Sequence, residues 1–185
     1  MDKVALVKEH IEEVMKILEL PITESNKDTP NRVAKMWCNE LFQNRNNLNI
    51  EELKSSMTTF PNEYESEMVI VKDIPFNSIC EHHWLPFNGT VTVGYVPRDT
   101  VIGLSKIPRV VKYFSKKPQL QEQFTTEIGE FLSDVLNPHA IFVEVEAKHQ
   151  CIACRGAESD CSTKTFYKDI EYGYEKSYKD FITRM

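Results

Sequence analysis

The sequence predicts an α+β fold, and three observations lead to that class. Two segments near the N-terminus have helical periodicity, strand composition begins at Met68, and the later helices and strands do not alternate as regular βαβ units. The chain has 185 residues, close to the ~150 residues of an average domain, which predicts one domain with room for a small appendage.

The N-terminal part is predicted to contain two helices. The second helix would begin at Thr29-Pro30, with Thr29 as its N-cap. Residues 44–67 are polar and irregular, so we expect a linker there. Apolar residues at three- and four-residue steps form the stripe of each helix: Val4, Val7, Ile11, Val14, Met15 and Leu18 in the first, which Pro21 ends, and Val33, Met36, Trp37 and Leu41 in the second.

The remaining chain is predicted to mix strands with two more helices. Residues 68–75 and 90–96 have strand composition, and Asn88-Gly89 is a strong signal for a hairpin turn. Ser105 is expected to cap a helix that runs to about residue 115, and Pro118 to open another. Residues 140–147 alternate as a half-buried strand before a loop-rich tail. We therefore divide the chain into a helical N-terminal region, residues 1–67, and a second region, residues 68–185.

Charge and composition exclude several functional classes. The 22 basic and 28 acidic side chains leave a net charge of −6, which disfavours non-specific binding to nucleic acid. No apolar run approaches the ~18 residues of a membrane span, and the N-terminus lacks the apolar core of a signal peptide. Five cysteines are an odd number, unlike a secreted disulfide framework. We expect a cytoplasmic protein, in which cysteine near histidine indicates metal binding or catalysis.

Two short cysteine and histidine clusters are the strongest chemical signal. Cys80-Glu81-His82-His83 contains a C-x2-H pair, a spacing that allows a thiolate and an imidazole to reach one metal ion. The second cluster is His149-Gln150-Cys151-Ile152-Ala153-Cys154. Any one of these cysteines alone would be interpreted as a small buried apolar residue, but two clusters together predict a metal site.

Spacing alone allows two metal sites. A closed tetrahedron of Cys80, His83, Cys151 and Cys154 would hold structural zinc. An open set without Cys154 would keep one position for water, and would leave His82 and His149 beside the metal as candidates for acid–base work.

Groups suited to an anionic substrate favour the open site. Ser105-Lys106-Ile107-Pro108-Arg109 opens a helix, where free backbone N–H groups and two cations can bind an anion. Arg155 follows the second cluster, and Arg32 and Lys35 lie three residues apart on a predicted helix. Glu122 can accept two parallel hydrogen bonds from a planar N–H edge such as that of guanine.

These motifs resemble the GTP cyclohydrolase I family in kind and in order. The resemblance covers residues 28–165 and implies a T-fold, in which an antiparallel four-stranded sheet has two helices between strands 2 and 3 and follows a helical N-terminal part. It also implies a homodecamer with active sites at subunit interfaces. The motifs are Asp28-Thr29-Pro30-Asn31-Arg32-Val33-Ala34-Lys35-Met36, Cys80-Glu81-His82-His83, Gly103-Leu104-Ser105-Lys106 with Arg109, Gln119-Leu120-Gln121-Glu122, and His149-x-Cys151 with Arg155-Gly156.

The resemblance also implies a role for each matching residue. Cys80, His83 and Cys151 match zinc ligands, and His82 and His149 match catalytic histidines. Ser105, at the ribose and phosphate end, belongs with the catalytic group, Glu122 matches the carboxylate that anchors guanine, and Gln121 belongs with the substrate-binding residues. Lys106, Arg109 and Arg155 match triphosphate contacts, and Arg32 and Lys35 would come from a neighbouring subunit.

The implied reaction opens the imidazole ring of GTP at C8, releases formate and forms 7,8-dihydroneopterin triphosphate. Zinc suits it because zinc lowers the pKa of bound water from 15.7 to about 7. Cys154 and Glu158 depart from the family pattern, and the tail from Cys161 follows it only loosely. They keep open the alternative of a non-catalytic or substrate-shifted T-fold relative with structural zinc.

Overall fold

The computed structural model describes residues 2–44 and 49–184. Its helices are α1 (Lys3–Ile17), α2 (Thr29–Met36), the π-helix η1 (Trp37–Leu41), α3 (Ile50–Ser55), α4 (Lys106–Phe114), α5 (Gln121–Leu136), α6 (Gln150–Ala153) and α7 (Lys176–Arg184). Its strands are β1 (Thr59–Pro61), β2 (Val69–Cys80), β3 (Pro86–Val96), β4 (Thr100–Ile102), β5 (Pro118–Gln119), β6 (Ala140–His149) and β7 (Ser162–Ile170).

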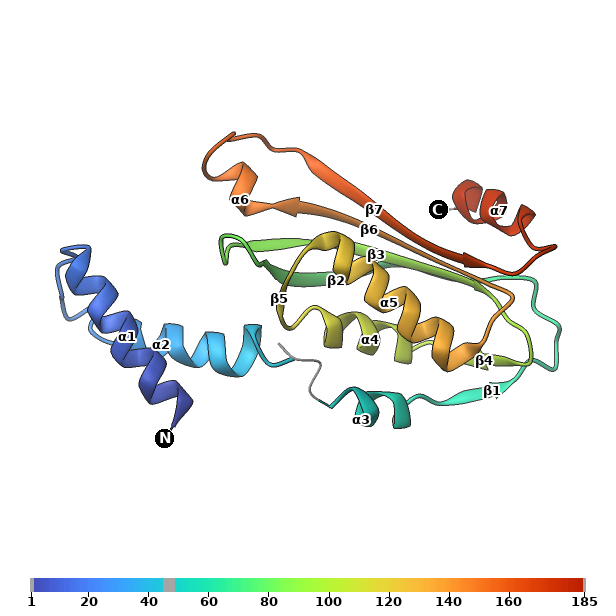
Figure 1. Cartoon of the computed structure of the whole chain (residues 1–185), viewed down its shortest axis with the longest axis horizontal. Coiled ribbons are helices and arrows are strands. Elements are labelled where there is room, and N and C mark those ends of the chain that lie inside the picture. The colour runs from blue at the N-terminus through green and yellow to red at the C-terminus, as the bar shows by residue number, and fades with distance from the viewer. Residues whose placement is uncertain (1, 45–48, 185) are drawn as a thin grey trace.

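The main sheet has the strand order β5-β2-β3-β6-β7. Strands β2, β3, β6 and β7 pair antiparallel, and the two-residue β5 adds a short parallel pairing to the end of β2. Helices α4 and α5 lie between β3 and β6 in the chain and cover one face of the sheet (Figure 1). The α+β class and the T-fold arrangement of four antiparallel strands with two helices are confirmed.

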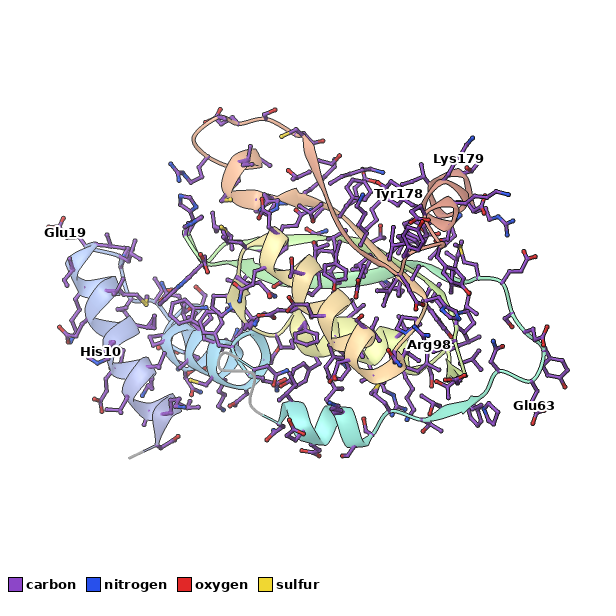
Figure 2. All side chains as sticks on the ribbon, turned by 45° about the vertical axis from the view of Figure 1, so that its right-hand side comes forward. His10, Glu19, Glu63, Arg98, Tyr178 and Lys179 are labelled. Carbon is purple, nitrogen blue, oxygen red and sulfur yellow. The ribbon has the colours of Figure 1, made fainter. Side chains whose placement is uncertain are left out.

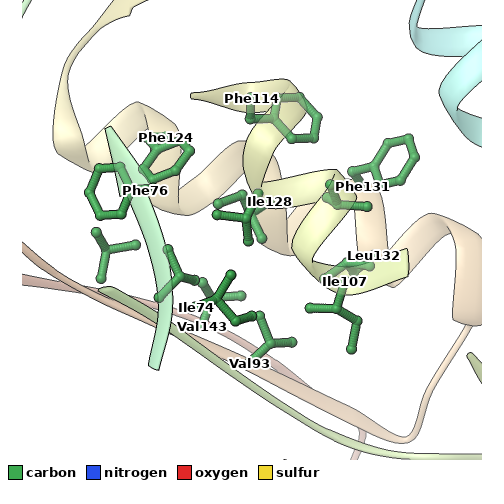
Figure 3. Close-up of a cluster of buried hydrophobic side chains, with 14 of the residues drawn as sticks. Ile74, Phe76, Val93, Ile107, Phe114, Phe124, Ile128, Phe131, Leu132 and Val143 are labelled. Atoms are coloured by element: carbon green, nitrogen blue, oxygen red, sulfur yellow. The ribbon is translucent and has the colours of Figure 1, made fainter. Parts of the chain in front are cut away.

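The core lies between the sheet and these two helices, because alternate strand residues point to the same face. Val93 of β3 and Val143 of β6 meet Ile107 of α4 and Ile128 and Leu132 of α5 in this core (Figure 3). The opposite face of β6 packs on α7 instead: the rings of Phe142 and Phe181 stack with centroids 5.0 Å apart. The sheet is therefore buried on both faces near β6.

The prediction of a hairpin turn at Asn88-Gly89 is wrong. Both residues lie inside β3, where Asn88 pairs with Asn77, and the turn is formed by residues 81–85. Gly89 is needed for a different reason, since a Cβ atom there would lie 1.8 Å from the Glu146 carbonyl oxygen of β6. The later turn extends β2 to Cys80 and places His82 and His83 in the turn itself.

Three further boundaries also differ from the predictions. Pro118 does not open a helix, because residues 118–119 pair with Ile79 and Cys80, and α5 begins at Gln121. The predicted linker contains α3 and β1, while its residues 45–48 lie outside the described part. The tail contains β7 and α7 rather than loops. In β7, the half-buried residues Thr163, Thr165 and Tyr167 alternate with exposed ones. Because two of these three are threonines, the strand lacks the apolar alternation that is easily seen in a sequence.

The N-terminal helices stand away from the sheet. Helix α1 packs on α2 (Figure 1). Met15 of α1 is buried, whereas Ile17 and Leu18 are exposed. In Figure 2, His10 and Glu19 mark this end of the molecule, and Arg98 and Tyr178 mark the opposite end. Within the described residues, none of the helices has the length and apolar character needed to cross a bilayer.

Candidate active site

The two cysteine and histidine clusters meet at one end of the sheet. Cys80 is the last residue of β2, and His149 is the last residue of β6, opposite Phe87 at the start of β3. Short α6 then places Cys151 beside them. A pocket of about 330 Å³ opens here, lined by Cys80, His82, His83, Gln119, Leu120, Gln121, Glu122, His149, Cys151, Ile152 and Thr163. A larger pocket of about 860 Å³ near α7 contains none of the predicted site residues.

Cys80, His83 and Cys151 form a compact group of potential metal ligands. One ligand atom from each lies within 4.8 Å of the others, and Cys80 Sγ is 4.0 Å from His83 Nδ1. Ligands of tetrahedral zinc at ~2.0–2.3 Å from the ion lie roughly 3.5–3.8 Å apart, so a small contraction would suit the ion. Exposed Cys154 does not belong to this group, which favours the open set over the closed one.

The two thiols of this group are not equivalent. Cys80 is buried at the end of its strand, and Cys151 is half-buried on α6. Burial raises the pKa of the Cys151 thiol, and the neighbouring Cys80 raises it further, while the charge of Arg155 opposes the shift. A divalent cation would reverse this effect, because a coordinated thiol is deprotonated.

His149 is held by two contacts from the protein. Its ring lies parallel to Phe87, and its Nε2 lies 2.8 Å from Gln121 Oε1. Burial lowers the pKa of His149, and the negative charge of Glu122 partly opposes that shift. Burial therefore favours a neutral imidazole at the edge of the pocket.

The other pocket residues differ in exposure. His82 is exposed in the turn, with Nε2 3.8 Å from Glu81 Oε1 and its ring centroid 6.2 Å from that of His83. Glu122 is exposed in the first turn of α5, whereas its neighbour Gln121 is buried. The pocket thus brings together the three ligand candidates, both histidines and the carboxylate.

Six further predicted site residues do not line this pocket. Ser105 and Lys106 lie where α4 begins, after β4 and away from the Cys/His group, and Lys106 Nζ donates to the Ser56 carbonyl oxygen (Figure 1). Arg109 is exposed on the same helix, Arg32 and Lys35 are exposed on α2, and Arg155 is exposed just after α6. Ser105 precedes α4 without a side-chain capping bond, so its predicted capping role is not seen.

Two residues of the site escaped the sequence argument. Phe87 lies outside the predicted strands 68–75 and 90–96, so its pairing with His149 does not follow from the sequence. Thr163 lies in the tail that was predicted to be loops. Regular alternation of Thr163, Thr165 and Tyr167 is the signal that could have revealed this strand.

A sequence model of the GTP cyclohydrolase I family matches residues 7–180. This chain belongs to the GTP cyclohydrolase I family. The GTP cyclohydrolase 1 of Streptococcus agalactiae is 44% identical over 161 residues, which cover 83% of each chain. That of Streptococcus thermophilus is 46% identical over 139 residues, covering 75% of this chain and 72% of its own.

A family member with lower sequence identity aligns with a similar fraction of this chain. The GTP cyclohydrolase 1 of Serratia proteamaculans is 38% identical over 161 residues, covering 86% of this chain and 71% of its own. Among solved structures, the archaeosine synthase QueF-Like in its apo form aligns with a TM-score of 0.47 and 18% identity, covering 56% of this chain and 94% of its own. Family membership and the strand order together carry the fold assignment.

Proposed function

We propose that this protein is a zinc-dependent hydrolase that opens the guanine imidazole ring of GTP at C8, releasing formate and forming 7,8-dihydroneopterin triphosphate. One observation carries the proposal: in a chain of this family, the Cys-His-Cys group, His149 and the exposed carboxylate of Glu122 line the same pocket. Each of these groups has a separate task in the reaction.

Cys80, His83 and Cys151 would hold the zinc ion. Two thiols and one imidazole are ligands that zinc prefers, and three protein ligands leave the fourth position that a catalytic site requires. Zinc bound there would supply a water molecule whose pKa is lowered to about 7, so that C8 can be attacked without strong base. Cys154 would stay outside the coordination shell.

Glu122 would fix the guanine ring. It lies in the first turn of α5, at the rim of the pocket, with its carboxylate exposed. A carboxylate that accepts two parallel bonds from the N1–H and amino group of guanine positions the base as well as binding it. The opposite edge of the purine, with N7 and C8, would then face the Cys/His group.

His149 and His82 would move the protons. Protonation of N7 makes C8 electrophilic, and the later steps of ring opening and reclosure each need a proton donor or acceptor. His149 is positioned by Phe87 and Gln121, whereas His82 lies in the exposed turn. Because half-buried His149 favours its neutral form, it would first take up a proton from water in the pocket and then pass it to N7, and the exposed His82 can exchange protons with solvent.

The positions of the residues expected to bind the triphosphate and ribose support an assembly in which two subunits form each active site. Ser105, Lys106, Arg109, Arg32 and Lys35 lie outside the pocket of their own chain. We propose that neighbouring subunits bring them to it, with Arg155 at the pocket's own edge, in a homodecamer. Exposed apolar residues on α1, Val14 and Ile17 among them, are suited to subunit contacts. The division at residues 67/68 and the cytoplasmic location stay predictions, as does the absence of nucleic-acid and membrane partners.

Zinc content and product release for two histidine variants test the assignment of roles. His82→Ala and His149→Ala should each lower formate and pterin release by ~10²–10⁴-fold, the usual contribution of general acid–base catalysis. Both variants should keep one zinc ion per subunit, because neither histidine belongs to the ligand group. Near wild-type rates in a zinc-loaded variant would remove that histidine from the mechanism, and lost zinc would overturn the ligand assignment.

A further inference from the structure

Gln121 has every polar atom of its side chain engaged by the protein. It is the first residue of α5, and its side chain is buried against the end of the sheet. Its Nε2 lies 3.0 Å from the Val145 carbonyl oxygen, 3.0 Å from that of Thr163, and 3.2 Å from Thr165 Oγ1. Its Oε1 lies 2.8 Å from His149 Nε2.

These contacts fix which way the amide points. Backbone carbonyl oxygens only accept hydrogen bonds, so the group that faces Val145 and Thr163 must be the NH₂ group. A flipped amide would set its oxygen against two carbonyl oxygens and leave a buried acceptor without a donor. Gln121 Oε1 therefore faces His149, and this oxygen only accepts.

The hydrogen-bond directions of the neighbouring threonine hydroxyls agree with this orientation of the amide. Thr125 Oγ1 donates to the Gln121 carbonyl oxygen at 2.7 Å, so it accepts at 2.5 Å from the Thr165 hydroxyl. With its proton directed to Thr125, Thr165 Oγ1 is left to accept from Gln121 Nε2. Backbone oxygens of α5, β6 and β7 thus anchor the network at its edges, and every donor has an acceptor.

The proton of a neutral His149 ring must then lie on Nε2. We propose that Gln121 is a positioning residue, which holds His149 in the Nε2–H tautomer and reserves Nδ1 as the ring nitrogen that exchanges a proton with the substrate. The proposal rests on the proposed function and extends it by naming the nitrogen atom of His149 that exchanges the proton. It also argues against Gln121 as a substrate contact, the role implied by family resemblance, because both amide hydrogens face protein acceptors and the amide oxygen accepts from His149.

A double-mutant cycle separates positioning from substrate contact. Gln121→Met keeps the side-chain length and removes the polar atoms, so kcat for formate release should fall by about 10–10³-fold; wrong-tautomer variants elsewhere lose up to ~10⁴-fold. In a His149→Ala background, the same change should alter kcat by about twofold or less, because the residue it positions is gone. An equal fall in both backgrounds would overturn the proposal.

Ligand affinity gives a second, independent readout. 7-Deaza-GTP has carbon in place of N7, so its Kd measures binding of the base and phosphates without proton transfer to that atom. Gln121→Met should leave this Kd within about threefold of the wild-type value, in contrast to Glu122→Gln, which should weaken binding by about 10-fold or more. A Gln121→Met variant that weakens binding as much as Glu122→Gln would make Gln121 a substrate contact and contradict the proposal.

Gln119 supplies a matched control for the loss of a buried amide. It lines the same pocket and is also buried, but its Nε2 donates to Ser78 Oγ and the Phe114 carbonyl oxygen rather than engaging His149. Gln119→Met should lower Tm, as Gln121→Met should, while lowering kcat less, and similar falls in kcat would show a general structural effect instead.

The tautomer can be observed without turnover. Nitrogen NMR of histidine-labelled, zinc-loaded protein at about pH 8, with His149→Ala for assignment, should show the ring proton of His149 on Nε2. In Gln121→Met, the proton should no longer be confined to Nε2. A wild-type ring with its proton on Nδ1 would contradict the inference. If wild-type protein released no formate from GTP, the proposed function would fail while this measurement still reported on the tautomer.

Discussion

The imidazole of His149 and the phenyl ring of Phe87 lie face to face, with centroids 4.7 Å apart and planes inclined by 2°. The two residues are paired across β3 and β6, so the register of the sheet sets the contact. Phe87 is fully buried, and it covers one face of the imidazole while Gln121 engages its edge. The ring is thereby held in both position and orientation.

Replacement of Phe87 by leucine should impair catalysis more than it impairs folding. Loss of the flat surface lets the His149 ring tilt, so kcat should fall at least about tenfold, as for a misplaced catalytic group. Phe114→Leu, in another part of the core, is the matched control. Both changes should lower the free energy of unfolding by less than the ~3–5 kcal/mol of a Phe→Ala change. Equal falls in kcat for the two variants would rule out a specific role for Phe87.

The ligand assignment predicts opposite outcomes for two neighbouring cysteines. Cys151→Ser should lose most of the bound zinc and all measurable turnover, because Cys151 belongs to the ligand group. Cys154→Ser should keep both, because exposed Cys154 lies outside it. Zinc analysis of the purified variants and an X-ray absorption spectrum of the wild type provide the measurement. A spectrum with three sulfur ligands would favour the closed site.

Shared active sites predict complementation between inactive subunits. Arg32→Ala and His149→Ala variants remove groups that the proposed assembly joins across an interface. Mixed assemblies, formed after dissociation, should regain part of the activity because some interfaces then hold neither substitution. Each variant treated alone in the same way is the control. A catalytically competent species of 21.5 kDa in light scattering would refute shared sites.

The pH dependence of folding stability in the acid range should depend on Glu171, which lies at the end of the sheet far from the pocket. Its carboxylate accepts from His139 Nδ1 at 2.6 Å and from Arg98 at 2.8 Å, and these contacts lower the pKa of Glu171, the His139 bond most. A carboxyl group whose pKa is lower in the folded state stabilises the protein above its ordinary pKa of 4.5, and this stability is lost as the pH falls further.

Glu171→Gln should therefore have a lower Tm than wild type at neutral pH, and the difference should shrink as the pH is lowered below 4.5. Glu9→Gln, an exposed change on α1, should show little difference at any pH. Thermal unfolding followed by circular dichroism across the acid range measures both. A Tm difference that grows on acidification would mean that the carboxylate does not provide this stability.

Sequence patterns predicted the regular core and the Cys/His chemistry well, because both depend on local spacing. The apolar stripe of α5 and the C-x2-H pair needed no knowledge of distant contacts. The Asn88-Gly89 turn failed because Gly89 is required by the close approach of β6, a contact that lies more than fifty residues away. Strand β7 was missed because two of the residues that face inward, Thr163 and Thr165, are threonines, and Tyr167 is the large one among them.

The network around His149 could not be derived from the sequence. Gln121 is adjacent to Glu122 in the chain, and helical spacing turns the two side chains in different directions, one into the protein and one to solvent. Which of them meets the substrate depends on β6 and β7, whose carbonyl oxygens occupy the amide of Gln121. Similarly, Ser105 and Lys106 lie outside the pocket because α4 begins away from it, and the sequence does not show where that helix begins relative to the Cys/His group.

Product release from GTP by the purified zinc-loaded protein shows whether the pocket of Cys80, His83 and Cys151 opens the guanine ring. Formate is quantified enzymatically, and the pterin by its fluorescence after oxidation. Wild type should release equal amounts of the two products, and Cys151→Ser should release neither. Wild-type protein that carries one zinc ion per subunit yet releases neither product from GTP would contradict the proposed function.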